Sequence, residues 1–433
     1  MSFLRGRRDA ATGILGVLVL LVAFFSLITL QEHALTGSEA ASQMLQALPS
    51  GDGQLLIAIS NHPEDQQLAG SLFQQGLPQA TRIIREPREA RQTLDKLARE
   101  SSPLKAILCS ATASQWLVLQ DVGASFPSLG KPMLILPSKQ YWPTFLKAEN
   151  LLNIANQIAV IAILAIGMTM VIITGGIDLS VGSLIALSAV ATTLLIRDAW
   201  GGMAASPAGM ILASAAGMML CGLIGASSGL IITRLNVPPF IVTLAVMLTT
   251  SGLAYHLAES QSISQVPESF VWLGRGSSVL GLPNAVLLML ALYALAHLIM
   301  TQTRFGRHLY AIGGNLEAAT LSGLPVRKAV TWAYIVSGLL AGLGGVVTAS
   351  LLKSGSPTYG TMYELYVIAA VVVGGTRLSG GKGSMPGTLM GALIIAVLQN
   401  GMNLTNVESN TQKIVLGLVI LAAVVADRCR PNL

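Results

Sequence analysis

Charged side chains are scarce in this chain of 433 residues. They make up 11% of it, whereas soluble domains carry about 25%, and mean hydropathy is +0.66. This composition excludes an ordinary soluble protein. A helix crosses the roughly 30 Å hydrocarbon core of a bilayer with about 20 residues, and the chain holds many apolar runs of that length. Because spanning helices satisfy their own backbone, we predict an all-α polytopic membrane bundle.

Cysteine is also scarce, with three residues at Cys109, Cys221 and Cys429. They lie far apart and lack metal-ligand spacing, which argues against both a disulfide framework and a zinc site. Motifs for metalloprotease or serine-hydrolase chemistry are missing as well. The sequence therefore predicts no catalytic residue, no metal and no cofactor bound by this chain. The net charge of +6 lacks the basic and aromatic pattern of a nucleic-acid reader.

A nucleotide-binding loop is excluded in the glycine-rich segment 374–388 (GGTRLSGGKGSMPGT). The motif requires a glycine where the chain has Thr376, and a serine or threonine where Gly383 follows Lys382. Small residues here favour close helix packing or a flexible loop. These motifs therefore give no indication that the chain is an enzyme.

The first 30 residues read as a cytoplasmic N-terminus followed by a membrane span. Arg5, Arg7 and Arg8 precede an apolar run over 12–30 that is long for a signal-peptide core and lacks a small-residue cleavage site. Basic residues mark the cytoplasmic side. We interpret the run as an uncleaved first helix, with a cleaved signal peptide as the alternative.

Residues 31–147 change character, because charges occur throughout and no apolar run is long enough to span a membrane. Short apolar stretches alternate with helical patterns, which predicts a small α/β domain with a mostly parallel sheet. It would lie outside the cytoplasm if the first span is real. The four predicted strands are 54–60 (QLLIAIS), 81–86 (TRIIRE), 104–110 (LKAILCS) and 132–137 (PMLILP).

Nine further spans are predicted within residues 148–428, which makes about ten with the first. The basic loops then fall on the cytoplasmic side, including the long loop 302–328, and so do both termini and the tail 429–433. The 364–376 span is the shortest unless Gly374 and Gly375 extend it. The nine spans are 151–173, 180–196, 208–233, 239–257, 279–300, 329–351, 364–376, 385–402 and 411–427.

The segment TGGIDLSVGS (174–183) places a carboxylate between two spans. An ionised group near hydrocarbon is costly, so Asp178 indicates a polar site with close partners. Gly175 and Gly176 can end one helix, and Asp178 can cap the next by accepting from amides two or three residues on. One interpretation is a capped turn at the membrane surface; the other is a gate in a broken helix. The candidate gate residues are Thr174, Gly175, Gly176, Asp178 and Ser180.

Neutral polar side chains inside the spans have two interpretations. They can form hydrogen bonds between helices, or they can line a route for a polyol, since such a solute needs hydroxyl and amide partners more than ion pairs. The candidate pathway residues are Asn156, Gln157, Thr243, Thr249, Gln399 and Asn400.

Within the 302–328 loop, NLEAATLSGL is typical of a short amphipathic helix, with Asn315 as cap and Gly323 as stop. Leu316, Ala319 and Leu324 would lie near one face. The helix could rest on lipid headgroups, or it could dock a soluble partner.

These segments together resemble the integral membrane permease subunit of bacterial ABC importers for ribose and related sugars, a group that includes the autoinducer-2 and xylose permeases. The resemblance covers roughly residues 148–428. It implies ten helices, both ends inside, in the bacterial cytoplasmic membrane. It rests on four segments in the family's order, 166–188 (IGMTMVIITGGIDLSVGSLIALS), 234–247 (RLNVPPFIVTLAVM), 305–324 (FGRHLYAIGGNLEAATLSGL) and 374–392 (GGTRLSGGKGSMPGTLMGA).

The resemblance also implies partners for this chain. They are a second permease subunit, either identical or a sister chain, an extracytoplasmic solute-binding protein that delivers the sugar, and a separate ABC ATPase subunit inside. In such importers a short cytoplasmic helix fits a groove on the ATPase. The matching residues here are Gly313, Gly314, Asn315, Glu317, Ala318, Ala319, Ser322 and Gly323.

The 31–147 insertion departs from the family, whose typical members have a short loop there. It could assist docking of the binding protein, represent part of a binding lobe, respond to a second ligand, or have no role in transport. Branched-chain amino acids and nucleosides remain alternative cargoes. A membrane sensor would need a cytoplasmic output domain, and an ion-coupled transporter would need more charges within its spans; neither feature is evident.

Overall fold

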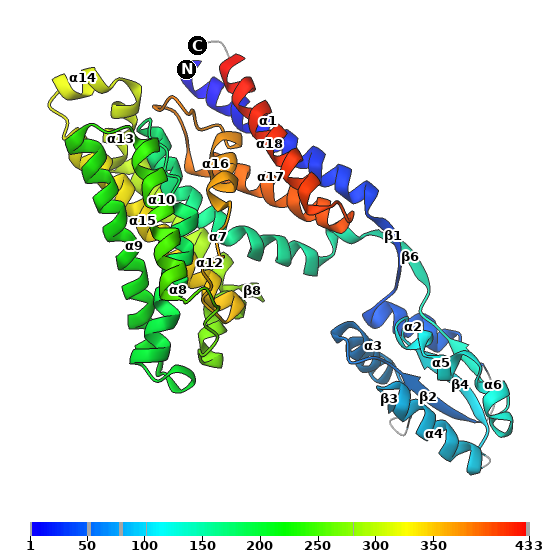
Figure 1. The fold of residues 1–433 in the computed structure, drawn as a ribbon. Coiled ribbons are helices and arrows are strands. Elements are labelled where there is room, and N and C mark those ends of the chain that lie inside the picture. The colour runs from blue at the N-terminus through cyan, green and yellow to red at the C-terminus, as the bar shows by residue number, and fades with distance from the viewer. Residues whose placement is uncertain (1, 50–52, 78–80, 101, 280, 430–433) are drawn as a thin grey trace. The chain divides into compact units, whose positions relative to one another are not determined.

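The computed structural model describes residues 2–49, 53–77, 81–100, 102–279 and 281–429, and the side chains within these ranges from 13 to 425. The chain divides into two compact units. Unit 1 comprises residues 1–29 and 144–433, and unit 2 comprises Leu30–Pro143. Figure 1 shows the helices of unit 1 and the small sheet of unit 2.

Unit 1 is built from long apolar helices. In the described part of the chain, seven are long and apolar enough to cross a membrane, and three shorter apolar stretches lie at Gly13–Ile28, Tyr363–Val373 and Ser409–Val425. The helices that contain these seven long and three shorter apolar segments are α1 (Ser2–Ile28), α7 (Ala148–Ile173), α8 (Val181–Ala199), α9 (Pro207–Leu235), α10 (Pro239–Leu257), α12 (Asn284–Gln302), α15 (Val326–Leu352), α16 (Tyr363–Val373), α17 (Met385–Leu404) and α18 (Ser409–Cys429).

Helix ends follow local chemistry. The Ser206 hydroxyl caps α9 by accepting from the Gly209 amide, and Pro207 occupies the first turn, where its missing N–H costs nothing.

The predicted span 279–300 begins too early, because Ser277–Val279 (β7) and Leu282–Pro283 (β8) pair as a small antiparallel ribbon before α12. The short helices of unit 1 are α11 (Trp272–Arg275), α13 (Arg304–Gly314) and α14 (Leu316–Leu321).

Helix α15 forms the centre of unit 1 and packs against α9, α8 and α7. Glycines permit the close approach: a methyl group at Gly338 would overlap the carbonyl oxygen of Cys221 on α9, and one at Gly342 would lie 2.8 Å from the Met218 Cα. Small residues at helix interfaces are typical of membrane bundles, because backbones there gain contact by approaching closely.

Unit 2 contains a four-stranded parallel sheet with strand order β3-β2-β4-β5. Alternate residues face opposite sides, so that Ile57 and Leu108 belong to one buried cluster and Leu56 and Ile107 to the other. A separate antiparallel ribbon joins β1 to β6. The elements are β1 (Leu30–Ala34), α2 (Gly37–Gln46), β2 (Gln54–Ala58), α3 (Pro63–Gln74), β3 (Arg82–Ile84), α4 (Pro87–Arg99), β4 (Leu104–Cys109), α5 (Leu117–Gln120), α6 (Val122–Ser125), β5 (Met133–Ile135) and β6 (Lys139–Pro143).

Two polar groups of unit 2 are sequestered in its fold. Asp65 Oδ2 accepts hydrogen bonds from the Ser60 amide (2.9 Å), the Ser60 hydroxyl (2.6 Å) and the Ser110 hydroxyl (2.6 Å), which ties α3 to the ends of β2 and β4. Burial raises the pKa of the Cys109 thiol to about 12. That thiol is therefore uncharged at neutral pH and is unsuited to metal binding or nucleophilic attack.

Candidate functional site

The turn between α7 and α8 is closed by its glycines. The Gly176 amide donates to the Val171 carbonyl at 3.1 Å, and Gly175 has a φ of +82°. A left-handed residue ending a helix is ordinarily glycine, because other side chains are strained there. The predicted role of the glycine pair as a helix stop is therefore confirmed.

Asp178 is buried in this turn, with 2% of its surface exposed. Its Oδ1 accepts from the Ser180 amide (3.0 Å) and hydroxyl (2.6 Å), and its Oδ2 accepts from the Ser337 hydroxyl on α15 (2.8 Å). The bond to the amide two residues on closes a local turn just before α8, whose first residue is Val181. Both oxygens are thus satisfied without a cation, and the carboxylate fastens the turn to α15.

Two more side chains hold the same turn. The Ile177 carbonyl accepts from the Thr243 hydroxyl on α10 (3.3 Å) and lies 3.5 Å from the Tyr334 hydroxyl on α15. A methyl group at Gly176 would lie 2.5 Å from that tyrosine oxygen, so only glycine fits. The structure therefore brings predicted pathway residue Thr243 into the candidate gate, where α7, α8, α10 and α15 meet.

The short helix α14 protrudes from the 302–328 loop (Figure 1). Asn315 caps it by accepting from the Ala318 amide at 2.9 Å, and Gly323 has a φ of +74° just beyond its end. Both predicted boundaries are therefore confirmed. Helix α13 precedes it and begins at a Thr303 hydroxyl that accepts from the Gly306 amide.

The exposed surface of α14 differs from the predicted apolar face. Ala319 is buried, whereas Leu316 is 55% and Leu321 is 90% exposed. Ala319 therefore anchors the helix and does not contribute to its outer surface. Leu321 was missed, although a leucine two residues beyond Ala319 on a short helix must point elsewhere. Glu317, Ala318, Ser322 and the flanking Gly314, Asn315 and Gly323 are exposed.

A glycine junction connects α13 to the C-terminal end of α7. The Gly381 amide donates to the Ile173 carbonyl at 2.9 Å, and a methyl group at Gly313 would overlap that carbonyl oxygen. The Tyr310 hydroxyl on α13 also donates to the Gly383 carbonyl at 2.9 Å. The end of α7, the last turn of α13 and the 374–384 loop thus form one contact, directly before the Asp178 turn.

The remaining neutral polar residues are not brought together. Asn150 and Asn400 exchange reciprocal hydrogen bonds of 3.0 and 2.9 Å between α7 and α17, so Asn400 serves helix packing. Thr249 donates to the Ala245 carbonyl of its own helix. Gln157 is exposed, Gln399 is half-buried, and the buried Oδ1 of Asn156 has no hydrogen-bond partner within the described structure.

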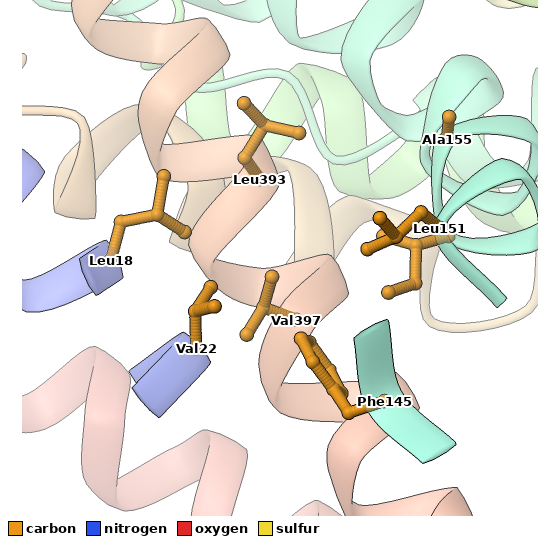
Figure 2. A pocket seen from close by; sticks show the side chains of 8 residues that line it. Leu18, Val22, Phe145, Leu151, Ala155, Leu393 and Val397 are labelled. Carbon is orange, nitrogen blue, oxygen red and sulfur yellow. The ribbon is translucent and has the colours of Figure 1, made fainter. Parts of the chain in front are cut away.

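A cavity of about 200 Å³ lies among α1, α7, α17 and the segment before α7. Figure 2 shows apolar side chains pointing toward one another across it. Since a sugar requires hydrogen-bond partners, this cavity does not suit one. Its lining is Leu18, Val22, Phe145, Leu151, Ile154, Ala155, Leu393 and Val397.

Comparison with known proteins covers the part of unit 1 that contains these sites. Residues 150–424 match the family model described as branched-chain amino acid transport system / permease component. Unit 2 lies outside that match. No solved structure matches the chain.

Individual relatives match most of their own length. The ribose import permease protein RbsC of Bacillus subtilis (strain 168) is 41% identical over 313 residues, which is 72% of this chain and 94% of the relative. RbsC of Escherichia coli (strain K12) is 43% identical over 66% of this chain and 87% of the relative. The L-arabinose transport system permease protein AraH of E. coli (strain K12) is 36% identical over 68% and 88%. The chain therefore belongs to the branched-chain amino acid transport system / permease component family.

Proposed function

We propose that this chain is the permease subunit of an ATP-binding-cassette importer that moves ribose or a related sugar across the bacterial cytoplasmic membrane. The observation that carries the proposal is 41–43% identity to ribose import permeases over nearly their whole length. The match to an L-arabinose permease at 36% points to the same cargo class. These relatives favour a sugar over a branched-chain amino acid or a nucleoside. A separate subunit hydrolyses ATP.

Helix α14 is the docking element for that ATPase in this proposal. It is capped at Asn315, anchored by Ala319 and presents Leu316 and Leu321 to solvent. Exposed leucines on a rigid helix suit insertion into a hydrophobic groove of a partner.

The glycine junction then carries movement of α14 to the gate. Gly313 leaves no space between α13 and the Ile173 carbonyl, so displacement of α13 must also shift the end of α7. The next residues are the Asp178 turn, which Ser337 connects to α15. ATP-driven closure of the ATPases would switch this turn between two arrangements, since coupling requires contacts that differ between states.

The topology in this proposal has ten crossings, made by α1, α7, α8, α9, α10, α12, α15, α16, α17 and α18. An even number of crossings puts both termini on the same side, and Arg5, Arg7 and Arg8 before the first crossing favour the cytoplasmic side. Arg234 at the end of α9 and the basic residues of the α13–α15 region and the 374–384 loop then also lie inside, as the distribution of positive charge favours. Residues 31–147, which include unit 2, lie outside, where a solute-binding protein would deliver the sugar. A second permease subunit, identical or a sister chain, completes the pathway.

The test reconstitutes the importer in vesicles from this chain, its ATPase and its binding protein. We expect ATP-dependent ribose uptake and ATP hydrolysis that rises when ribose-loaded binding protein is added. Uphill accumulation of ribose by this polypeptide alone, with no nucleotide present, would refute the proposal. Ribose-independent hydrolysis that rises instead with a branched-chain amino acid would assign a different cargo.

A further inference from the structure

Helix α16 is too short to cross a membrane. Its 11 residues extend about 16 Å, roughly half of a 30 Å hydrocarbon core. Helix α15 ends at Leu352, and residues 354–362 between the two helices are not helical. The other half of this crossing must therefore be made by irregular chain.

Contacts with α8 show where the irregular segment runs. A methyl group at Gly355 would overlap the Thr193 hydroxyl, whereas one at Gly360 would overlap the Gly182 carbonyl oxygen. Thr193 and Gly182 are separated by about 16 Å along α8. Residues 354–362 therefore descend along α8 over the distance that α16 leaves uncovered.

The start of α16 lies near the middle of the bundle. A methyl group at Gly345 on α15 would lie 2.6 Å from the Ile185 carbonyl, so these two residues are level. Gly182 lies about one turn below Ile185, which places it about 24 Å along the roughly 40 Å length of α15. The segment that contacts Gly182, including Gly360 and Glu364, is therefore far from both membrane surfaces.

This mid-membrane segment carries polar and aromatic side chains. Thr358 and Thr361 are exposed, and Glu364 is partly exposed with Oε2 against the Gly182 backbone. The rings of Tyr363 and Tyr366 pack edge to face at 6.3 Å. Among the described residues, the ion pairs are Lys139–Glu32, Arg197–Asp198 and Lys353–Glu268, so Glu364 belongs to none.

Helix α17 adds an amide at a similar depth. Methyl groups at Gly391 and Gly387 would overlap the carbonyl oxygens of Ala370 and Gly374, which fixes α16 and α17 as antiparallel neighbours. In this antiparallel pairing, each step forward along α17 corresponds to one step back along α16. Gln399 on α17 is therefore level with Met362, the residue just before α16. Gln399 is half-buried and is one of the predicted pathway residues.

Such a surface cannot face lipid. Irregular backbone at membrane depth is tolerated only where it is buried in protein or lines a water-filled cavity, and an intramembrane carboxylate is costly against hydrocarbon. Broken crossings with a half-helix beginning near the midplane form binding sites in transporters for the same reason.

We propose that residues 358–366 form a sugar-contact surface inside the translocation pathway. Glu364 and the Thr361 hydroxyl bind sugar hydroxyl groups, and the rings of Tyr363 and Tyr366 face the apolar C–H side of the sugar. A carboxylate accepts hydrogen bonds from several hydroxyls at once, and tyrosine combines an apolar face with a polar end. This inference rests on the proposed import of a sugar, and it names the residues that the sugar passes.

Cysteine accessibility tests whether this surface is exposed to water and not to lipid. In an assembled importer whose native cysteines are replaced by alanine, Thr361→Cys should react with a charged, membrane-impermeant thiol reagent, and turnover with ribose should slow the reaction. The control is Leu223→Cys on α9, where the native side chain is 65% exposed; it should react only with a lipid-soluble maleimide. Equal reaction of the two variants with the charged reagent, or no reaction of Thr361→Cys with either reagent, would overturn the inference.

A transport assay tests the chemistry. Glu364→Gln keeps the side-chain volume but removes the charge, and we expect ribose uptake to fall about tenfold or more, while binding-protein stimulation of ATP hydrolysis persists. Leu298→Ala on α12, where the native side chain is 56% exposed, lies outside the proposed surface and should leave uptake near wild type. Wild-type uptake in Glu364→Gln would refute this site alone, whereas absence of ATP-driven ribose uptake in the wild type would refute the proposed function.

Discussion

At the scale of single residues, Gly313 is the position in unit 1 that leaves the least space for a side chain. Its Cα lies so close to the Ile173 carbonyl that a methyl group would overlap both this oxygen and the Gly381 amide. Gly314, the next residue, has nothing within 4 Å of the corresponding position. Two adjacent glycines thus differ completely in what they tolerate, and this difference is invisible in the sequence GGN.

Gly313→Ala should uncouple the importer. The added methyl group would force α13 away from the end of α7, and we expect binding-protein-stimulated ATP hydrolysis to fall severalfold while the chain still inserts in the membrane. Gly314→Ala is the matched control and should behave as wild type. Equal behaviour of the two variants would show that the junction carries no movement to the gate.

Asp178 shows the limit of reasoning from residue type. Its local bond to the Ser180 amide, two residues on, was predicted. Its burial was not, and the predicted cap is absent, because the N-cap residue of α8 is Ser180 and no side chain caps that helix. Its partner Ser337 lies 159 residues away, and a serine in an apolar helix gives no indication of which carboxylate it meets.

At the scale of elements, α14 is the helix whose bounds depend most on local sequence, because its cap, its buried anchor and its terminating glycine all fall within nine residues. The sequence predicted its bounds. It did not predict which side of the helix is exposed, since that depends on how α13 packs against it.

Leu321→Glu should weaken binding of the ATPase subunit. The native side chain is 90% exposed, so the substitution leaves the permease fold unstrained while placing a charge on the proposed docking surface. Co-purification of the ATPase from detergent measures the effect, and Thr320→Ala on the same helix is the control. Undiminished co-purification with Leu321→Glu would place the docking surface elsewhere.

Helix α16 corresponds to the shortest predicted span, 364–376, and the structure shows why it is short. It ends at Val373, where Gly375 has a φ of +85°, so the glycines terminate the helix and do not extend it. We infer that the part of the crossing that α16 does not cover is made by residues 354–362, which precede the helix. Hydropathy did not identify this segment because SGSPTYGTM is polar and irregular, and only the structure shows that it packs along α8.

At the scale of the whole molecule, unit 2 is inserted at a single point of unit 1. The Thr144 amide donates to the Thr29 carbonyl at 2.9 Å, so the chain leaves and re-enters unit 1 at adjacent residues. Excision therefore requires only a short connection, because two-residue loops suffice to join antiparallel neighbours.

Replacing Leu30–Pro143 with a short glycine–serine linker should leave unit 1 folded. We expect a monodisperse protein in detergent with a cooperative thermal transition, because the described partners of Asp178 and Gly313 (Ser180, Ser337, Ile173 and Gly381) all belong to unit 1. Ribose uptake by this variant separates the roles considered for the insertion: unchanged uptake favours a domain without a role in transport, and loss with intact ATPase binding favours assistance to the binding protein. An aggregated product would contradict the independence of unit 1.

The sequence by itself determined the positions of the apolar helices, the cap and stop of α14, the four strands of the parallel sheet of unit 2 and the polar turn at Asp178; it did not predict the ribbon of β1 and β6. These features depend on local composition and on neighbours a few residues apart. Only the tertiary structure decided that Ser337 holds Asp178, that Gly313 contacts the end of α7, and that the irregular segment 354–362 packs along α8 before α16 begins. Those pairings join residues far apart in the chain, and close packing selects among many small residues that look alike in sequence.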